Sequence, residues 1–256
     1  MPEESHPHCT RNRRKLLIQH LTEFQRTISQ DRLDAYRLPA LDDQHTLANY
    51  LWNIALSEAL YPVLEAFEVS LRNAIHTAAT AHFSTSWWFN DATILPLQRR
   101  EQKTLNDTLR NLNSHLRKQG KTLTPGKVVA ELSFGFWTGL LNRPYERYLW
   151  SFRRGGTNLM NAVVPNAPTS PINYQWRMHL ESYVDKIRRL RNRTFHYEPI
   201  WNWNNPSLPV QHAEILAAIG WISVDAQRMT QVLDRFPAVY QQGYSVYLPA
   251  VRQAFP

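Results

Sequence analysis

Long runs of helical periodicity constrain this chain more than any other feature of its sequence. From Thr46 to about Phe83, apolar residues recur at the spacing of one helix face, with Pro62 expected to kink or break the helix. A still clearer amphipathic pattern covers residues 96–119. No stretch alternates apolar and polar residues as strands do, and no internal repeat is present. The sequence therefore predicts an all-α fold.

The remaining segments also favour helices joined by short loops. Thr124 and Pro125 form a capping and first-turn pair for a helix that continues to about Leu141, and Gly135 and Gly139 within it indicate close packing. Further helices are expected over the following ranges: 13–29, 173–197, 210–235 and 245–254. Residues 1–12 are expected to form a flexible tail, and residues 13–256 a single all-α domain.

Composition narrows the class of protein. The chain has 256 residues, a formal net charge of +8 and one cysteine, so a disulfide scaffold and a multi-cysteine zinc site are excluded. No signal peptide is evident, and no apolar run reaches the length of a membrane span. We therefore expect a soluble cytoplasmic protein that does not contact a membrane. The excess of positive charge favours an acidic partner, with nucleic acid first.

Basic residues concentrate near the end of the helix expected at 173–197. Five of the eight residues from Lys186 to Arg193 are lysine or arginine. One or two cations would complement the negative end of a helix dipole, whereas five repel one another unless an anion lies nearby. An RNA backbone supplies such an anion. Arg188, Arg189 and Arg193 are therefore candidate RNA-binding residues.

The same segment carries the residues best suited to catalysis. Asn192 and His196 are four apart and share a helix face, whereas Arg191 lies about 140° from His196, so only a long side chain or a distorted last turn lets the two converge. Metalloprotease, P-loop, serine-hydrolase and paired-cysteine motifs are absent, and no acidic cluster predicts a metal site. We expect no metal and no cofactor.

Arginine, asparagine and histidine are sufficient to cleave RNA. The 2′-hydroxyl attacks the adjacent phosphorus, an imidazole moves a proton, and a guanidinium stabilises the charge that develops on the phosphate. DNA lacks the 2′-hydroxyl, so this combination indicates RNA as the substrate. For His196, the alternative role is that of a residue capping the helix C-terminus.

These residues resemble a known family. RNRTFH (191–196) fits the Arg-Asn-three-residues-His signature of HEPN ribonucleases, and LRNRTFHYEPIWN (190–202) resembles abortive-infection proteins of the Abi-like (AbiD/AbiF) type. LEAFEVSLRNAIH (64–76) is similar to the first conserved helix of that family, and ELSFGFWTGLL (131–141) to its middle block. Together the similarities run in family order across about residues 15–235.

The resemblance implies a HEPN-type helical bundle with additional helices. It implies a homodimer whose two Arg-His motifs share one cleft, and a toxin-like, metal-independent endoribonuclease that leaves cyclic phosphate ends in antiphage abortive infection. Arg191 and His196 would be catalytic, with Asn192 assisting, and a regulatory RNA or an antitoxin would be a further partner. Tyr197 stands where a second histidine is as readily expected, which matters only if that histidine contributes to catalysis.

A polar stripe follows the 64–76 block. Glu65, Glu68, Arg72 and His76 lie on one side of an otherwise apolar helix, and Glu68 and Arg72 have the spacing of an ion pair. Glu68, Arg72 and Asn73 would line the cleft and position Arg191 or the RNA. The alternative is an internal salt bridge that fixes the helix register. His76 is expected to be structural.

Two interpretations remain open for each of the other candidate RNA-binding residues. An exposed basic face of the 96–119 helix either follows an RNA backbone or is merely solvated; it consists of Arg99, Lys103, Arg110 and Arg117. Trp201, with Trp203, either stacks on an unpaired base or closes the core. For the chain as a whole, the alternative to a nuclease is a non-cleaving RNA-binding or antitoxin-binding module, or a scaffold of a defence system.

Overall fold

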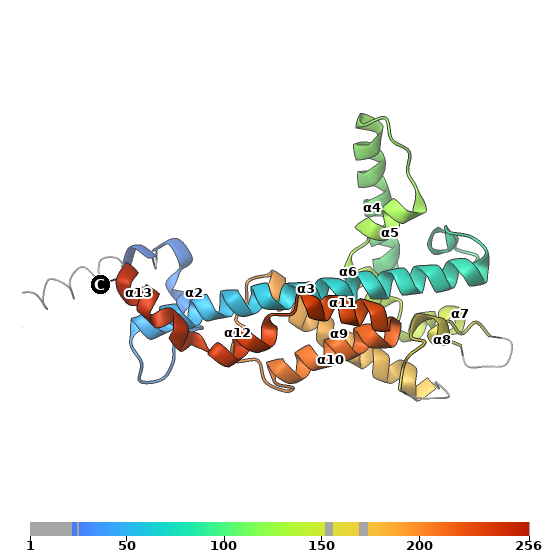
Figure 1. Cartoon of the computed structure of the whole chain (residues 1–256). Helices are drawn as coiled ribbons and strands as arrows, with labels where there is room; N and C mark the ends of the chain where they lie inside the picture. Colours follow the sequence, from blue (N-terminus) through green and yellow to red (C-terminus); the bar gives the residue numbers. More distant parts are fainter. Residues whose placement is uncertain (1–21, 25, 152–155, 169–173, 256) are drawn as a thin grey trace, which may run out of the picture. The chain divides into compact units, whose positions relative to one another are not determined.

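The computed structural model describes residues 22–24, 26–151, 156–168 and 174–255 (Figure 1). These residues form helices joined by loops, with one isolated β-bridge between Trp150 and Asn158 and no sheet within the described ranges. The all-α prediction is confirmed. The tail expected at residues 1–12 lies outside the described residues.

The helices follow one another in this order: α2 (Gln30–Asp34), α3 (Asp43–Phe83), η1 (Trp88–Asn90), α4 (Arg99–Lys118), α5 (Pro125–Glu131), α6 (Phe134–Gly139), η2 (Arg143–Tyr145), α7 (Glu146–Leu149), α8 (Met160–Val163), α9 (Tyr174–Phe195), α10 (Leu208–Ile222), α11 (Val224–Val232), α12 (Phe236–Gln242), η3 (Tyr244–Tyr247) and α13 (Leu248–Ala254). None of the helices that the structure describes has both the length and the apolar character needed to cross a membrane.

Contacts within the chain divide it into two compact units. Unit 1 comprises residues 1–61, 193–210 and 234–256, and unit 2 comprises residues 62–192 and 211–233. Helices α3 and α9 contribute residues to both units. A single domain over residues 13–256 stays a prediction.

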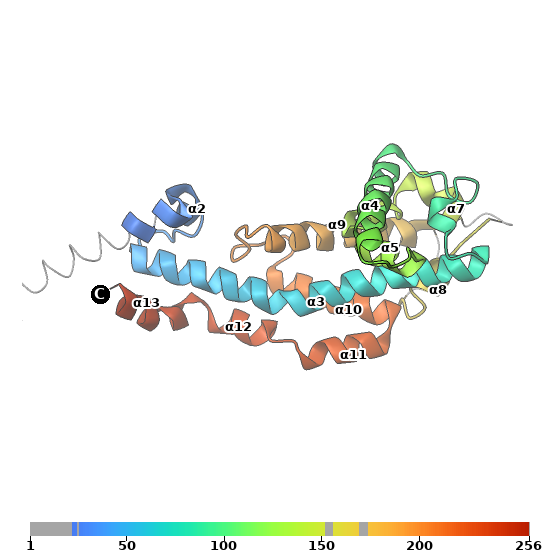
Figure 2. The same cartoon turned by 90° about the horizontal axis from the view of Figure 1, so that it is seen from above.

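Unit 1 is built around the N-terminal half of α3, which α2 and α13 flank (Figure 2). Its apolar core gathers Leu33, Leu47, Ala48 and Val251, and aromatic side chains, among them Tyr50, pack against this cluster. The loop after α2 is fixed by a buried amide on α3. Asn49 is fully buried there, and its Nδ2 donates to the main-chain oxygen of Tyr36 at 2.9 Å.

Helix α3 is one unbroken helix from Asp43 to Phe83, so a break at Pro62 is not observed. Proline removes one intrahelical hydrogen bond and crowds the preceding turn. Three apolar residues within two positions of Pro62 are almost fully buried, with 0% of Leu60, 1% of Val63 and 1% of Leu64 exposed. Burial of this apolar surface offsets the lost hydrogen bond and keeps the chain helical.

Two other helices predicted as continuous are interrupted by serine caps. The helix that starts after Thr124 ends at Glu131, and α6 restarts after Ser133, whose side chain accepts from the Phe136 N–H at 3.3 Å. The helix predicted over 210–235 is divided in the same way at Ser223, which accepts from the Ala226 N–H at 3.2 Å. Each hydroxyl satisfies an otherwise unpaired N–H and so favours a new helix start.

Within unit 2, α4 and α5 form an arm, with α4 leading away from α6 and the chain returning beside it (Figure 1). The base of the arm is tightly packed. A Cβ on Gly139 would lie only 2.7 Å from Oε1 of Glu101, so a larger residue there would require the Glu101 side chain to move. Glu101 also accepts a hydrogen bond from the hydroxyl of Tyr145 at 2.8 Å. The prediction of close packing at the Gly135 and Gly139 pair is confirmed for Gly139.

Candidate functional site

The Arg191-Asn192-x3-His196 motif lies at the end of α9, where the backbone closes in a Schellman arrangement. The N–H of Tyr197 donates to the Thr194 carbonyl at 3.3 Å, and the N–H of Glu198 to the Arg193 carbonyl at 2.9 Å. The helix therefore ends at Phe195, two residues before the predicted end. His196 follows as the C-cap with an exposed side chain.

Tyr197 makes this closure with a left-handed backbone. Its φ is 59°, a conformation that glycine adopts more readily than other residues. The guanidinium of Arg32 on α2 donates to the main-chain oxygen of Tyr197 and so holds the strained residue in place. Both residues belong to unit 1, and the end of α9 is thus tied to α2.

A buried amide on α3 fixes the segment that follows the motif. Asn53, with 3% of its surface exposed, accepts from the N–H groups of Ile200 at 2.7 Å and Trp201 at 3.0 Å. The indole N–H of Trp201 donates to the main-chain oxygen of Ala35 at 3.1 Å. These contacts agree with the interpretation that Trp201 packs over the core. Its role in RNA binding stays a prediction. The sequence reasoning missed Asn53, although an amide one turn after Asn49 in an apolar helix was the available signal.

In unit 2, the structure brings Glu68 and Arg191 together, as the sequence analysis expected. The Nε of Arg191 donates to Glu68 Oε2 at 3.2 Å, and its Nη1 to the Asn192 side-chain oxygen at 3.4 Å. The pair is largely enclosed, with 27% of the arginine and 19% of the glutamate side chain exposed. Charged hydrogen bonds in such surroundings restrict the guanidinium to one orientation.

The predicted ion pair between Glu68 and Arg72 is not formed, and Arg72 instead donates to the main-chain oxygen of Ala130 at 3.0 Å. That carbonyl lies in the last turn of α5, where it lacks a helical partner and attracts a cation. Asn73 is exposed. His76 is half-buried and accepts from the indole N–H of Trp88 at 3.2 Å, and burial lowers its pKa. This contact agrees with a structural role for His76.

The basic cluster on α9 has carboxylate partners within the protein. Asp185 accepts from Arg188 at 2.5 Å and lies 3.4 Å from Arg189, both within unit 2. Within unit 1, Arg193 lies 3.0 Å from Glu198. The sequence argument that these cations require an external anion was therefore too strong, because it ignored acids one turn away and beyond the helix end. Binding of RNA by Arg188, Arg189 and Arg193 stays a prediction.

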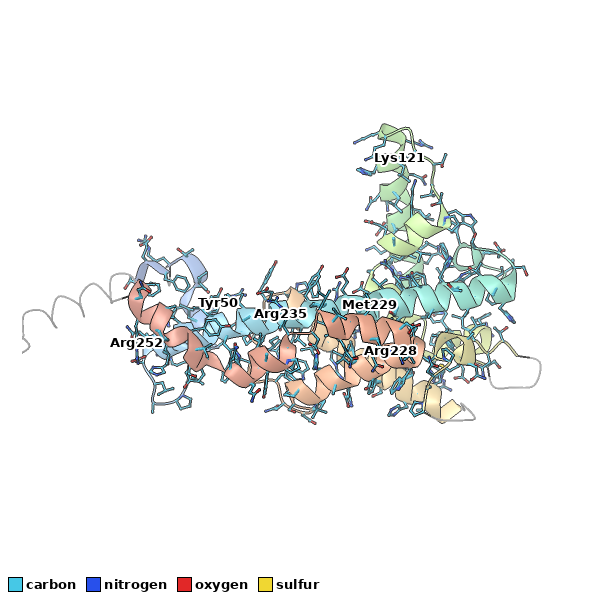
Figure 3. All side chains as sticks on the ribbon, viewed as in Figure 1. Tyr50, Lys121, Arg228, Met229, Arg235 and Arg252 are labelled. Atoms are coloured by element: carbon cyan, nitrogen blue, oxygen red, sulfur yellow. The ribbon has the colours of Figure 1, made fainter. Side chains whose placement is uncertain are left out.

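A second basic surface lies on the arm formed by residues 99–127, here called the cationic arm. Its face on α4 is exposed and consists of Arg99, Lys103, Arg110 and Arg117, which fall within an arc of about 40°. The arm contains eight lysines and arginines against two acids, in a chain whose formal net charge is +8. Lys121 lies at its tip (Figure 3). Most of the net charge of the chain is thus placed on one projecting element.

A cavity of about 500 Å³ lies in unit 1 beside the end of α9. It is here called the aromatic cavity and is lined by the following residues: Arg32, Tyr36, Tyr50, Asn53, Ile54, Ser57, Glu58, Tyr61, Thr194, Phe195 and Tyr197. Figure 3 marks Tyr50 on α3. The sequence reasoning missed this cavity because its walls come from three segments far apart in the chain. Among the described residues, no group of three or more histidine, cysteine, aspartate and glutamate side chains is placed to hold a metal ion.

Comparison with known proteins gives one result that identifies the family. The family model of the Abi-like proteins matches residues 16–202, which is more than half of the chain and includes Glu68, Arg191, His196 and the 131–141 block. No curated protein and no solved structure matches the chain. By this match over its first three quarters, the chain belongs to the Abi-like protein family.

Proposed function

We propose that this Abi-like protein is a metal-independent endoribonuclease of HEPN type, acting as a toxin in antiphage abortive infection. The observation that carries the proposal is the contact of 3.2 Å between Arg191 and Glu68. It joins two blocks that the sequence analysis singled out, and both lie inside the family match. The proposal includes a homodimer in the cytoplasm, with a regulatory RNA or an antitoxin as a further partner.

The proposed reaction uses the groups of the motif. The 2′-oxygen of one ribose forms a bond to the adjacent phosphorus while the bond to the 5′-oxygen breaks, which leaves a 2′,3′-cyclic phosphate and a 5′-hydroxyl. His196 accepts the proton of the 2′-hydroxyl or donates one to the leaving oxygen. Arg191 stabilises the charge on the phosphate oxygens, and Asn192 and Glu68 hold Arg191 in orientation. The motif of a second protomer would supply the second proton transfer.

The proposal is tested with the full-length protein and total RNA in the presence of excess EDTA. We expect cleavage to continue at an unchanged rate, because no step uses a metal, and the new ends to be 2′,3′-cyclic phosphates and 5′-hydroxyls. End-specific ligation and phosphatase sensitivity distinguish these ends from 3′-hydroxyls. Cleavage that stops with EDTA and returns with Mg²⁺, or products with 5′-phosphates, would contradict the proposal.

Replacing Glu68 tests whether it positions Arg191. We expect Glu68→Ala to lower kcat about tenfold with KM nearly unchanged, because Arg191 remains present but is no longer held in one orientation. Glu68→Gln, whose amide oxygen still accepts from Nε, should lie between the wild type and Glu68→Ala. Glu65→Ala is the matched control, since Glu65 is exposed one turn earlier on α3. Equal kinetics for Glu68→Ala and Glu65→Ala would exclude the positioning role.

The second candidate function is an RNA-binding module that does not cleave. The cationic arm favours it, because eight basic residues there can hold a phosphate backbone without any contribution from the motif. The two candidates separate in the assay described above. A binder retains RNA in a salt-dependent manner and produces no new ends, whereas the nuclease produces them.

A further inference from the structure

We propose that the aromatic cavity of unit 1 holds one unpaired nucleobase of an RNA strand. This inference deepens the proposed function, since it takes RNA as the ligand, and it adds a base-binding site to the backbone contacts considered so far. At about 500 Å³ the cavity lies within the range of small-molecule sites. Three kinds of observation support the assignment: the aromatic walls, the polar groups among them, and the position beside His196.

The walls offer exposed aromatic surface at the entrance of the cavity. The ring of Tyr61 lies 5.3 Å from that of Phe195 at an interplanar angle of 32°. Tyr61 is 49% exposed and Tyr197 is 73% exposed, so both keep large apolar faces in contact with water. Aromatic faces of this kind stack on any of the four bases, since every base has a π-face.

The surface of the cavity is mainly apolar, and the charged side chains in its lining are Arg32 and Glu58. The hydroxyl of Tyr36 accepts from Asn53 Nδ2 at 3.3 Å, and both side chains are almost fully buried, so this pair stabilises the wall of the cavity and does not itself contact the base. Glu58 contributes a carboxylate, which lies 2.7 Å from Arg235 and accepts only from donors. This carboxylate can accept from the amino group of adenine, cytosine or guanine, or from the N3–H of uracil. Arg32 adds a positive charge close to the RNA backbone.

The position of the cavity connects it to the motif. Thr194, Phe195 and Tyr197, which precede and follow His196 in the chain, all line it. A base seated there would bring its own ribose and phosphate toward the end of α9, where His196 is the C-cap. The cavity would therefore choose which nucleotide lies beside His196, and base preference at the cut would originate here.

The test measures binding in full-length protein that carries His196→Ala, so that the RNA stays intact. The probe is a single-stranded RNA hexamer with one 2-aminopurine, whose fluorescence falls when the base stacks. We expect Tyr61→Leu to weaken binding about tenfold and to abolish the quenching, because one stacked base contributes on that order. Tyr61→Phe keeps the ring and should bind within twofold. Tyr148→Leu, on α7 in unit 2, is the matched control and should change nothing.

Each other outcome overturns the assignment. Unchanged affinity and quenching in folded Tyr61→Leu protein would show that the cavity does not hold the base. If Tyr61→Leu weakens self-association in sedimentation but not RNA binding, the cavity is covered by a second copy of the chain. If nucleoside monophosphates bind as tightly as the hexamer, and the hexamer does not displace them, the ligand is a free nucleotide.

The test also separates this inference from the proposed function. If Tyr61→Leu abolishes the quenching but the wild type never cuts RNA, the base-binding site is supported and the proposed nuclease activity is contradicted. If the wild type cuts RNA but Tyr61→Leu changes neither binding nor cut-site preference, the nuclease is supported and the base-binding site is contradicted. Thermal unfolding of each variant identifies protein that has failed to fold. If Tyr61→Leu does not fold, the same measurements are made on Tyr197→Leu, which removes the other exposed aromatic ring of the lining.

Discussion

His196→Ala should abolish RNA cleavage while leaving the affinity for RNA within a few-fold of the wild type. The imidazole is the general acid or base of the proposed reaction, and positioned proton transfer accelerates such reactions by about 10²- to 10⁴-fold. Binding depends mainly on contacts that lysine and arginine side chains make to phosphates, to which one imidazole adds little. The variant is therefore expected to lose cleavage without a comparable loss of affinity for RNA.

The measurement compares rates of total-RNA cleavage with affinities from salt-matched filter binding. The matched control is His179→Ala, because His179 is also an exposed histidine of α9. The stability of the His196 variant should change by less than about 1 kcal/mol, since a residue at the C-cap loses only part of its interaction with the helix dipole. If binding falls by the same factor as cleavage, or if the two histidine variants behave alike, His196 is a binding or structural residue.

The sequence predicted helices correctly where a periodic apolar face is long, and it failed where a single polar residue decides the backbone. Helix α4 is confirmed to within three residues at its start, because its leucines must share one buried face. Periodicity could not reveal the division at Ser133, because apolar spacing continues across it and only the serine hydroxyl favours a new helix start. At Pro62 the opposite occurred, and tertiary burial prevailed over a local preference.

The contacts of the candidate site that could be predicted are those between residues that both lie in sequence motifs. The contact between Glu68 and Arg191 was expected because both lie in blocks that resemble one family. The partner of Arg72 was not, since the carbonyl of Ala130 carries no signature in the sequence. The aromatic cavity could not be predicted from the sequence for a related reason. Tyr36, Tyr61 and Phe195 meet only through the packing of α2, α3 and the end of α9, which no local pattern encodes.

The largest effect on stability is expected for Arg177→Met. Arg177 lies near the start of α9 with only 2% of its surface exposed, and it donates to the Leu141 carbonyl and to Glu181 Oε2, each at 2.7 Å. Methionine keeps much of the volume but leaves the carbonyl without this donor and the glutamate without this cation. Breaking a buried pair costs about 3–5 kcal/mol, and the partial exposure of Glu181 places the expected loss near 3 kcal/mol.

The measurement is the midpoint of urea unfolding, followed together with the cleavage rate. Because α9 also carries Arg191, weaker anchoring of its first turns should lower activity in proportion to the folded fraction, with the kcat of the folded protein unchanged. Arg228→Met provides the control: Arg228 lies on α11 (Figure 3), is 73% exposed and lies 3.3 Å from Asp225, so its loss should change stability by less than about 0.5 kcal/mol. Equal midpoints for the two variants would mean that methionine packs well enough to replace the buried pair.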